Sequence, residues 1–204
     1  MQQRIGILGG SFNPIHLGHL NIACAARDRL RLSKVLFLPC KVSPFKTASS
    51  PESFINDSHR LKMIELSIEG YESFELSLME IERGGISYSY DTVSRIRKKY
   101  PDSEIFFIIG ADTRRTLSEW YRIHALLNMC EFVTVNRPGV EDMSSVPGLS
   151  AEENRRLAEY RITGRLFDIS SSEIRRKIAE GKSVKQLVSP DVEKYIQRHG
   201  LYGS

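Results

Sequence analysis

Short apolar runs alternate along the chain with stretches in which apolar residues recur every three or four positions. The apolar runs predict strands at residues 5–8, 34–38, 104–109, 131–135 and within 161–169. The helical spacing predicts helices at residues 18–32, 57–70, 87–99, 170–180 and 190–199. Phe74, Leu76 and Leu78 alternate with polar residues and predict one more strand, running on through Ile81 towards Gly84. This order predicts an α/β fold whose first strand, helix and strand form a right-handed βαβ unit of a parallel sheet.

The composition is typical of one soluble globular domain spanning residues 1–204. Of the 204 residues, 41% are hydrophobic and 26% charged, which is enough for a substantial core. Three widely spaced cysteines favour neither a disulfide framework nor CxxC chemistry. The sequence has no signal peptide and no apolar run of membrane length, so we expect a cytoplasmic protein without a membrane partner.

The net charge of +4, with a pI near 9.0, raises the question of nucleic-acid binding. The excess is small, and the basic residues are interleaved with acids, as in SEIRRKIAEGK. Solvated helix faces explain most of these cations, and a small polyanionic substrate would use a few of them. We therefore expect no nucleic-acid partner.

The first apolar run breaks at Gly9 and Gly10, which leave room for a bulky anion beside the backbone. The next helix begins near Gly18, so its N–H groups, with about half a positive charge, face this loop. His16 and His19 stand three residues apart where the helix opens, so both can face one anion. Imidazoles that donate to phosphate oxygens suit a reaction without a protein nucleophile. We predict a phosphate site here.

Other interpretations of this stretch stay open. No GxxxxGKS/T occurs, and the glycine spacing does not spell GxGxxG, so neither a P-loop nor a nicotinamide dehydrogenase is supported. Either histidine alone would be read as a solvated cap. A zinc pair is a third interpretation, but no further ligand stands at a spacing typical of zinc sites.

Candidate chemistry also occurs after the buried strand 104–109. Asp112 follows that strand at the sheet edge where open α/β sheets bind ligands, although a helix cap is the simpler interpretation. Trp120 could offer a flat face to a heteroaromatic ring, although a lone tryptophan usually packs in the core. Ser170–Glu180 opens a helix with hydroxyls in its first turn and Arg175 on the next, which predicts a second anion site or a capped, solvated helix.

Residues 39–57 are rich in Pro, Ser and Lys and too long for a simple connection. They predict a mobile active-site loop. Lys41 and Lys46 would close over phosphates there, although exposed loop lysines are more often only solubilising.

The segment GGSFNPIHLGHL resembles the signature of the nucleotidylyltransferase superfamily, (H/T)xGH. Further segments occur in the order typical of bacterial nicotinate-nucleotide adenylyltransferases: IERGGISYSYDTV, FIIGADTRRTLSEWYR, VNRPG, ISSSEIRRKI and VSPDVEKYIQRHGLY. Because several co-ordered matches are more specific than one, the chain is similar to this narrower family. The resemblance implies a Rossmann-like doubly wound parallel sheet over residues 1–168 and a small C-terminal helical segment, residues 169–204, that completes the ATP site.

The implied reaction joins ATP and nicotinate mononucleotide into deamido-NAD with release of pyrophosphate, Mg²⁺ being carried mainly by the ATP phosphates. The resemblance assigns catalytic roles to His16, His19, Lys46 and Arg175. It assigns ATP binding to Gly9, Gly10, Ser11, Phe12, Gly18, Ser171 and Ser172. It assigns mononucleotide and ribose binding to Ser89, Gly110, Asp112, Trp120 and Tyr121. A homo-oligomer is expected on general grounds only.

The chain departs from the family pattern at a few positions. Asn13 stands where Asp is usual, and Ser11, Ser89 and Ser172 stand where Thr is usual. SPFK replaces the typical PPHK, so Phe45 takes the place of a histidine and carries over no phosphate contact.

Four alternatives are kept. Phosphopantetheine adenylyltransferases and cytidylyltransferases share (H/T)xGH but do not predict GADTRRTLSEWYR and ISSSEIRRK together. Nicotinamide mononucleotide is a possible acceptor, because a carboxylate and an amide differ by a local contact. A catalytically silent nucleotide sensor would bind ATP without pyrophosphate release, and a basic nucleic-acid-binding domain would show salt-dependent binding.

Overall fold

The computed structural model describes residues 2–45, 55–136, 145–163 and 169–203. Its centre is a parallel sheet with the strand order β3-β2-β1-β4-β5-β6. The strands are β1 (Arg4–Gly10), β2 (Lys34–Pro39), β3 (Phe74–Leu76), β4 (Glu104–Gly110), β5 (Glu131–Asn136) and β6 (Arg161–Thr163). The order reverses at β1, so the fold is the Rossmann-like doubly wound α/β fold expected from the sequence.

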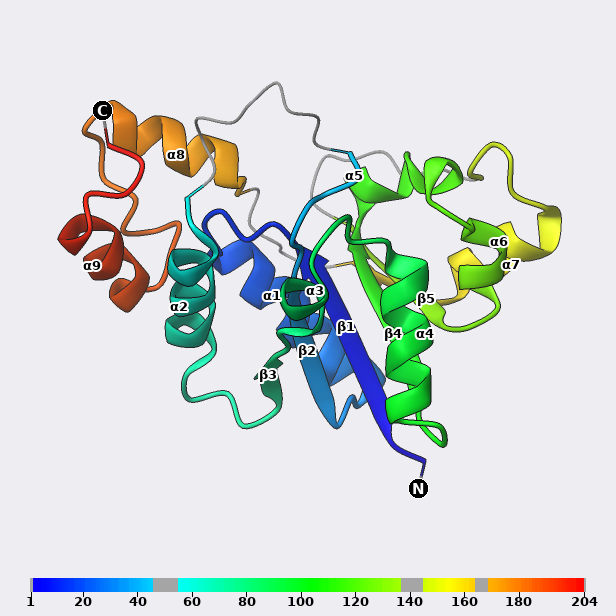
Figure 1. Ribbon diagram of the computed structural model, residues 1–204. Coiled ribbons are helices and arrows are strands. Elements are labelled where there is room, and N and C mark those ends of the chain that lie inside the picture. The colour runs from blue at the N-terminus through cyan, green and yellow to red at the C-terminus, as the bar shows by residue number, and fades with distance from the viewer. Residues whose placement is uncertain (1, 46–54, 137–144, 164–168, 204) are drawn as a thin grey trace.

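Helices cover both faces of this sheet (Figure 1). They are α1 (Leu17–Leu30), α2 (Asp57–Ile68), α3 (Met79–Arg83), α4 (Ser89–Lys99), α5 (Ala111–Arg114), η2 (Leu117–Glu119), α6 (Ile123–Leu127), α7 (Ala151–Glu159), α8 (Ser171–Ala179) and α9 (Pro190–Arg198). Within the described residues, no helix is long and apolar enough to cross a membrane. No disulfide joins the three cysteines.

Along the central strands, side chains alternate between two separate hydrophobic cores. On β1, Ile5 and Ile7 pack on the side of α4, α6 and α7, while Leu8 packs on the side of α1, α2, α8 and α9. This alternation follows from the period of two in a strand, and it explains why the central strands read as continuous apolar runs. Between Ile5 and Ile7, Gly6 leaves space for the side chain of Leu32, because a Cβ at Gly6 would lie 2.7 Å from Leu32 Cδ1.

The strand predicted through Ile81 towards Gly84 is wrong. β3 ends at Leu76, and Met79–Arg83 forms the short helix α3. The physical reason is that β3 is an edge strand paired with β2 only as far as Phe37. The next β2 residue on the β3 side is Pro39, which has no N–H to donate, so the pairing stops and Leu78 is left exposed.

Two stretches contain helices that the periodicity did not predict. Residues 111–127 hold three short helical elements after β4, and Ala151–Glu159 forms α7. A sequence signal for α7 was present, because Ser150 and Glu153 form a capping box with the S-x-x-E spacing. The last strand lies at the start of its predicted region, at Arg161–Thr163, whereas most of RLFDI falls outside the described residues.

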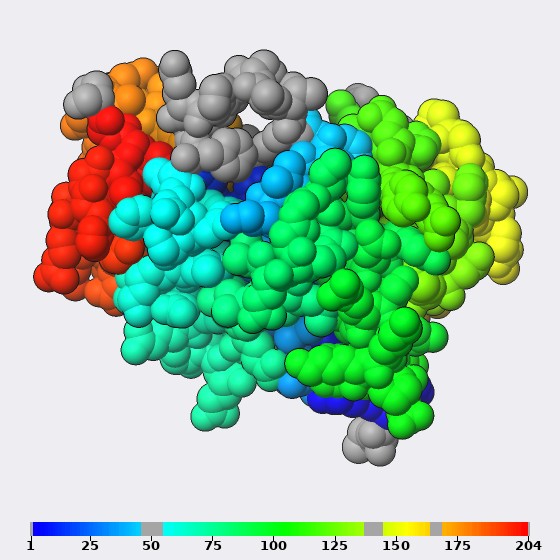
Figure 2. Space-filling model, viewed as in Figure 1, coloured from blue at the N-terminus to red at the C-terminus, as the bar shows by residue number. Residues whose placement is uncertain are grey.

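Helix α9 packs beside α2, and α8 lies on the same side of the molecule (Figure 1 and Figure 2). The Tyr195 hydroxyl of α9 and Nδ1 of His59 on α2 are 2.9 Å apart and hydrogen-bonded. The backbone N–H of Leu17, the first residue of α1, donates to the carbonyl of Leu187 at 2.9 Å. The C-terminal segment therefore supplies a hydrogen-bond acceptor to the N-terminus of α1.

Candidate active site

A cavity of about 310 Å³ opens at the carboxyl ends of β1 and β4, where the strand order reverses. Ligands bind at this position in open α/β sheets. The predicted site residues that line it are Gly9, Gly10, Ser11, His19, Ser89, Gly110, Asp112 and Trp120. The fold therefore brings these predicted residues, from three separate segments of the sequence, to one cavity.

Gly18 lets the two histidines stack at the start of α1. A Cβ on Gly18 would lie 2.9 Å from Nδ1 of His16, so only glycine leaves room for that ring. The ring centroids of His16 and His19 are 3.7 Å apart with an interplanar angle of 30°. His19 lines the cavity, whereas His16 is only 3% exposed and is not among the lining residues.

One hydrogen bond selects the tautomer of His19. The backbone N–H of His16 donates to Nδ1 of His19 at 3.2 Å. Nδ1 is therefore an acceptor, and the neutral ring carries its proton on Nε2. Nε2–H is the donor that His19 can present to a phosphate oxygen.

The backbone of the α1 N-terminus is partly occupied. The N–H groups of His16 and Leu17 donate to His19 Nδ1 and Leu187 O, and the N–H of His19 donates to His16 O at 2.9 Å. For the Gly18 N–H, no acceptor occurs among the described residues. The predicted anion site therefore uses fewer backbone donors than a bare helix end would offer.

The glycine loop is shaped by an aromatic side chain. A Cβ on Gly10 would lie 3.3 Å from the Phe12 ring, while one on Gly9 would only touch Phe107 at 3.8 Å. Phe12 has a φ of 45°, a region that non-glycine residues seldom adopt, and its ring packs against His19 with centroids 4.9 Å apart. Phe12 is buried and supports the loop from behind instead of lining the cavity.

The start of α8 is fastened to the loop that precedes His16. The hydroxyl of Ser171 donates to Pro14 O at 2.9 Å, and Nη1 of Arg175 donates to Asn13 O at 2.7 Å. Ser170 caps the helix by accepting from the Glu173 N–H. The N-termini of α1 and α8 thus meet at one loop, as a two-sided anion site requires. Ser172 is exposed at this end and accepts from Nη2 of Arg175 at 3.3 Å.

A buried arginine that the sequence analysis missed joins the ends of β1 and β2. Arg60 is 1% exposed; it donates to Ser11 O at 2.6 Å and to Cys40 O at 2.9 Å, and it pairs with Asp57. The carboxylate of Asp57 also forms an ion pair with the ammonium group of Lys41. Burial raises the pKa of Asp57, but the bonds from Arg60 and Lys41 outweigh it and hold that pKa below its usual range. The available signal was a charged residue on the apolar stripe of the helix predicted at 57–70.

A second missed group, Glu80, lies on the cavity wall. Its carboxylate accepts from Thr92 Oγ1 at 2.6 Å and from the Ser87 hydroxyl. Burial raises the pKa of Glu80, although both hydroxyls and Arg83 oppose the shift. Ser87 Oγ also accepts from the Lys41 N–H at 2.9 Å. Glu80 therefore fixes the segment before α4 against the segment after β2.

Aromatic rings form the outer wall of the cavity. Trp120 is held by edge contacts to Phe107 and Phe132, with centroids 5.7 and 6.2 Å away. Phe45 faces Trp120 from the segment after β2. Tyr121 lines an adjoining cavity of about 320 Å³, where its ring packs against Tyr88 at 4.6 Å.

Asp112 and Lys46 are the remaining predicted site residues. Asp112 is not a helix cap, because Gly110 is the N-cap of α5 and Asp112 lies in its first turn, on the cavity. Lys46, with residues 46–54 of the predicted loop, lies outside the described residues.

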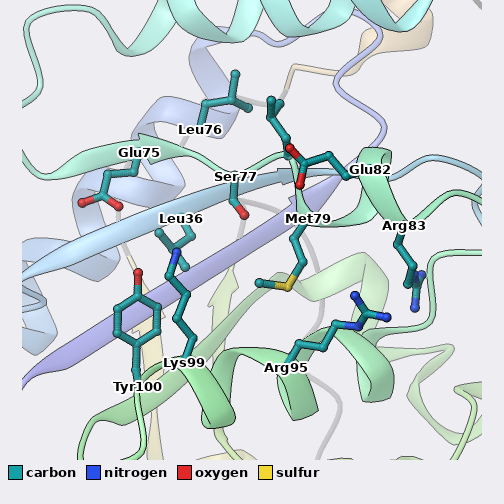
Figure 3. Close-up of a pocket in the computed structure, with 11 residues that line it drawn as sticks. Leu36, Glu75, Leu76, Ser77, Met79, Glu82, Arg83, Arg95, Lys99 and Tyr100 are labelled. Atoms are coloured by element: carbon teal, nitrogen blue, oxygen red, sulfur yellow. The ribbon is translucent and has the colours of Figure 1, made fainter.

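A larger cavity of about 450 Å³ lies between β3, α3 and the second half of α4. Figure 3 shows Arg95 and Lys99 reaching from α4 towards Met79 and Ser77. None of the residues predicted to bind substrate lines this cavity, and its cations are offset by Glu75 and Glu82. The smaller cavity is therefore the candidate site.

The described residues contain no group of three or more side chains suited to hold a metal ion. Mg²⁺ keeps several waters and often binds through substrate phosphates with one or two carboxylates. Asp112, exposed on the cavity wall, fits that limited role.

Comparison with known proteins agrees with this geometry. Residues 7–177 match the family described as Cytidylyltransferase-like. The probable nicotinate-nucleotide adenylyltransferase of Geobacillus thermodenitrificans is 38% identical over 201 residues, covering 98% of this chain and 87% of that protein. The nicotinate-nucleotide adenylyltransferase of Bacillus subtilis is 37% identical over 202 residues, covering 99% and 100%.

A solved structure shares the fold. Plasmodium falciparum nicotinic acid mononucleotide adenylyltransferase complexed with NaAD superposes with a TM-score of 0.77 over 98% of both chains. Its sequence is 19% identical, so this likeness concerns the fold alone. With near-complete coverage of relatives at 37–38% identity, the chain belongs to the nicotinate-nucleotide adenylyltransferases within the Cytidylyltransferase-like family.

Proposed function

We propose that this chain transfers the adenylyl group of ATP to nicotinate mononucleotide, forming deamido-NAD and pyrophosphate. The observation that carries the proposal is the meeting of two helix N-termini beside an aromatic-walled cavity at the sheet's switch point. Triphosphate suits the first feature, and a ring-bearing nucleotide suits the second. The names of the relatives support the same reaction.

In the reaction, a 5′-phosphate oxygen of the mononucleotide bonds to the α-phosphorus of ATP. The bond from that phosphorus to the bridging oxygen breaks, and pyrophosphate leaves with the electron pair. Such transfers depend mainly on in-line positioning and on donors that take up developing charge. No protein nucleophile is needed.

Particular side chains would supply those donors. His19 lines the cavity and would donate through Nε2–H, and the guanidinium of Arg175 has five N–H donors, of which its two described bonds use two. His16 would position His19 through ring stacking. The hydroxyl of Ser171 already donates to Pro14 O, so in this conformation it positions α8.

We further propose that the C-terminal segment, residues 169–204, completes the ATP site as part of one domain. The bonds from Arg175 and Ser171 to residues 13–14 support this role. Mg²⁺, carried by the phosphates with Asp112 nearby, would neutralise charge on the leaving pyrophosphate.

The test is pyrophosphate release from ATP and Mg²⁺ with one acceptor at a time. Nicotinate mononucleotide should support turnover far better than nicotinamide mononucleotide or phosphopantetheine. Preferred turnover with another acceptor would move the substrate assignment. ATP binding without release under any condition would favour the nucleotide sensor.

A further inference from the structure

Phe45 is placed unusually for a phenylalanine. Its side chain is 49% exposed, and it lines both the candidate site and the adjoining cavity. Its ring centroid lies 6.3 Å from that of Trp120, with an interplanar angle of 38°. Because aromatic side chains commonly line small-molecule sites, a half-exposed ring on the wall of two cavities suits contact with a ligand.

The chain just before Phe45 is fastened by its backbone. Val42 forms a parallel bridge with Ile86, and the Ser87 N–H donates to Val42 O at 2.8 Å. The Lys41 N–H donates to the Ser87 hydroxyl. The segment after β2 is thus tied to the segment before α4, which carries Ser89 into the same cavity.

The spacing of the two rings is close to that of a clamp. A third ring between two others needs about 7 Å from face to face, twice the usual carbon contact distance. The present 6.3 Å is slightly less, and Trp120 is fixed from behind by Phe107 and Phe132. A small rotation of the half-exposed Phe45 would open the gap.

The chemistry of the two substrates distinguishes which ring would enter. The pyridine nitrogen of nicotinate mononucleotide bonds to ribose, so this ring is a cation, whereas adenine is neutral. Cations are attracted to the faces of aromatic rings, most strongly to tryptophan. The proposed triphosphate donors come from α1 and α8, whereas Trp120 follows η2.

We propose that Phe45 is the second face of an aromatic clamp, opposite Trp120, which holds the pyridinium ring of the acceptor. The inference rests on the proposed function. It assigns to Phe45 recognition of the ring, with no contact to phosphate.

The single tryptophan of the chain provides the test. Trp120 fluorescence is titrated with nicotinate mononucleotide in the absence of ATP, and calorimetry gives an independent Kd. Phe45→Leu keeps apolar bulk but removes the π face, so Kd should rise about 10-fold. Phe45→Tyr keeps the face and should stay within about 2-fold.

Matched controls isolate the ring. Leu78→Ala removes an exposed apolar side chain outside the candidate site and should leave Kd unchanged. Ribose 5-phosphate, which lacks the ring, should bind Phe45→Leu and the unaltered chain equally, and the KM for ATP should not change. Thermal unfolding checks that each variant is folded.

Two outcomes would overturn the clamp. Unchanged binding of nicotinate mononucleotide by Phe45→Leu would show that Phe45 is not part of the acceptor subsite. If Phe45→Leu raised only the KM for ATP, Phe45 would contact adenine instead. Neither outcome affects the proposed function, which fails only if the unaltered chain does not turn over nicotinate mononucleotide.

Discussion

The missing side chain at Gly18 allows His16 to lie against the first turn of α1. From the sequence, glycine at this position reads as a helix start open to an anion. The structure adds a second reason, because the His16 ring fills the space that a Cβ would take. His16 and His19 therefore form a packed unit at the start of α1.

Gly18→Ala should disrupt that unit. The added Cβ, 2.9 Å from His16 Nδ1, would displace the ring and with it His19. Because misplacement by about 1 Å can cost about 100-fold in rate, we expect kcat to fall 10- to 100-fold. Steady-state pyrophosphate release measures this. Gly203→Ala, where the nearest atom would be 3.8 Å away, is the matched control, and equal activity of both variants would contradict the argument.

The two histidines should separate in their effects on stability. His19 lines the cavity, so His19→Ala should lower kcat by about 100-fold with little change in Tm. His16 is buried, so His16→Ala should lower kcat and also destabilise the fold by about 2 kcal/mol. Calorimetric Tm and pyrophosphate release would be compared on both variants; near-normal turnover in both would remove phosphate binding from this pair.

Sequence reasoning identified the residues that face the cavity better than those that support it. His19, Asp112 and Trp120 stand out by residue type at a strand end or helix start. Arg60 and Glu80 look like surface charges, because only tertiary structure supplies the carbonyls and hydroxyls that satisfy them.

At the scale of elements, long periodic stretches were predicted well and short ones poorly. α1, α2 and α4 bury enough apolar surface for their pattern to be visible, and β4 is an uninterrupted apolar run. α3 and α5 have one turn each, so neighbouring segments decide their conformation. The doubly wound arrangement was implied by the family resemblance, and the strand order itself was not predicted, since periodicity does not specify which strands are neighbours.

The start of α2 should make stability depend on pH. The pKa of Asp57 lies below its ordinary value of 3.8, so its contribution is complete above that pH and is lost as pH falls through the folded-state value. Asp57→Asn should lower the free energy of unfolding at pH 7 by about 1–3 kcal/mol. The gap between the two proteins should shrink below pH 3.8.

Denaturant unfolding at several pH values measures this gap. Glu152→Gln is the control, because Glu152 pairs with Arg155 on an exposed face and should change stability very little. A gap for Asp57→Asn that stays constant from pH 7 to pH 3 would show that the carboxylate charge plays no part.

At the scale of the whole molecule, the C-terminal segment meets the loop after β1 at one side chain. The hydroxyl of Tyr202 donates to Asn13 Oδ1 at 2.7 Å, and burial raises the pKa of this phenol, which keeps the donor protonated. Asn13 is also the residue that Arg175 holds through its carbonyl. One residue of the glycine loop thus receives two bonds from the C-terminal segment.

Tyr202→Phe should loosen this connection. Loss of one buried hydrogen bond should cost about 1 kcal/mol and lower Tm by about 2–4 °C. The KM for ATP should rise about 3-fold or more, while the KM for nicotinate mononucleotide stays unchanged. Tyr195→Phe, which removes the bond to His59 on α2, is the control with no expected effect on either KM. Equal changes in both KM values would argue against a role confined to the ATP side.

The capping of Leu17 by Leu187 also bears on the order in which the molecule is made. A ribosome adds about 5–20 residues per second, so α1 waits on the order of 10 to 30 seconds for the carbonyl that closes its first turn. For most of that interval the nascent chain can form its early strands but lacks α8, which begins at Ser171. If α8 completes the ATP site as proposed, a chain whose synthesis stops before residue 169 would have the sheet without this helix, so adenylyl transfer would begin only when translation is nearly complete.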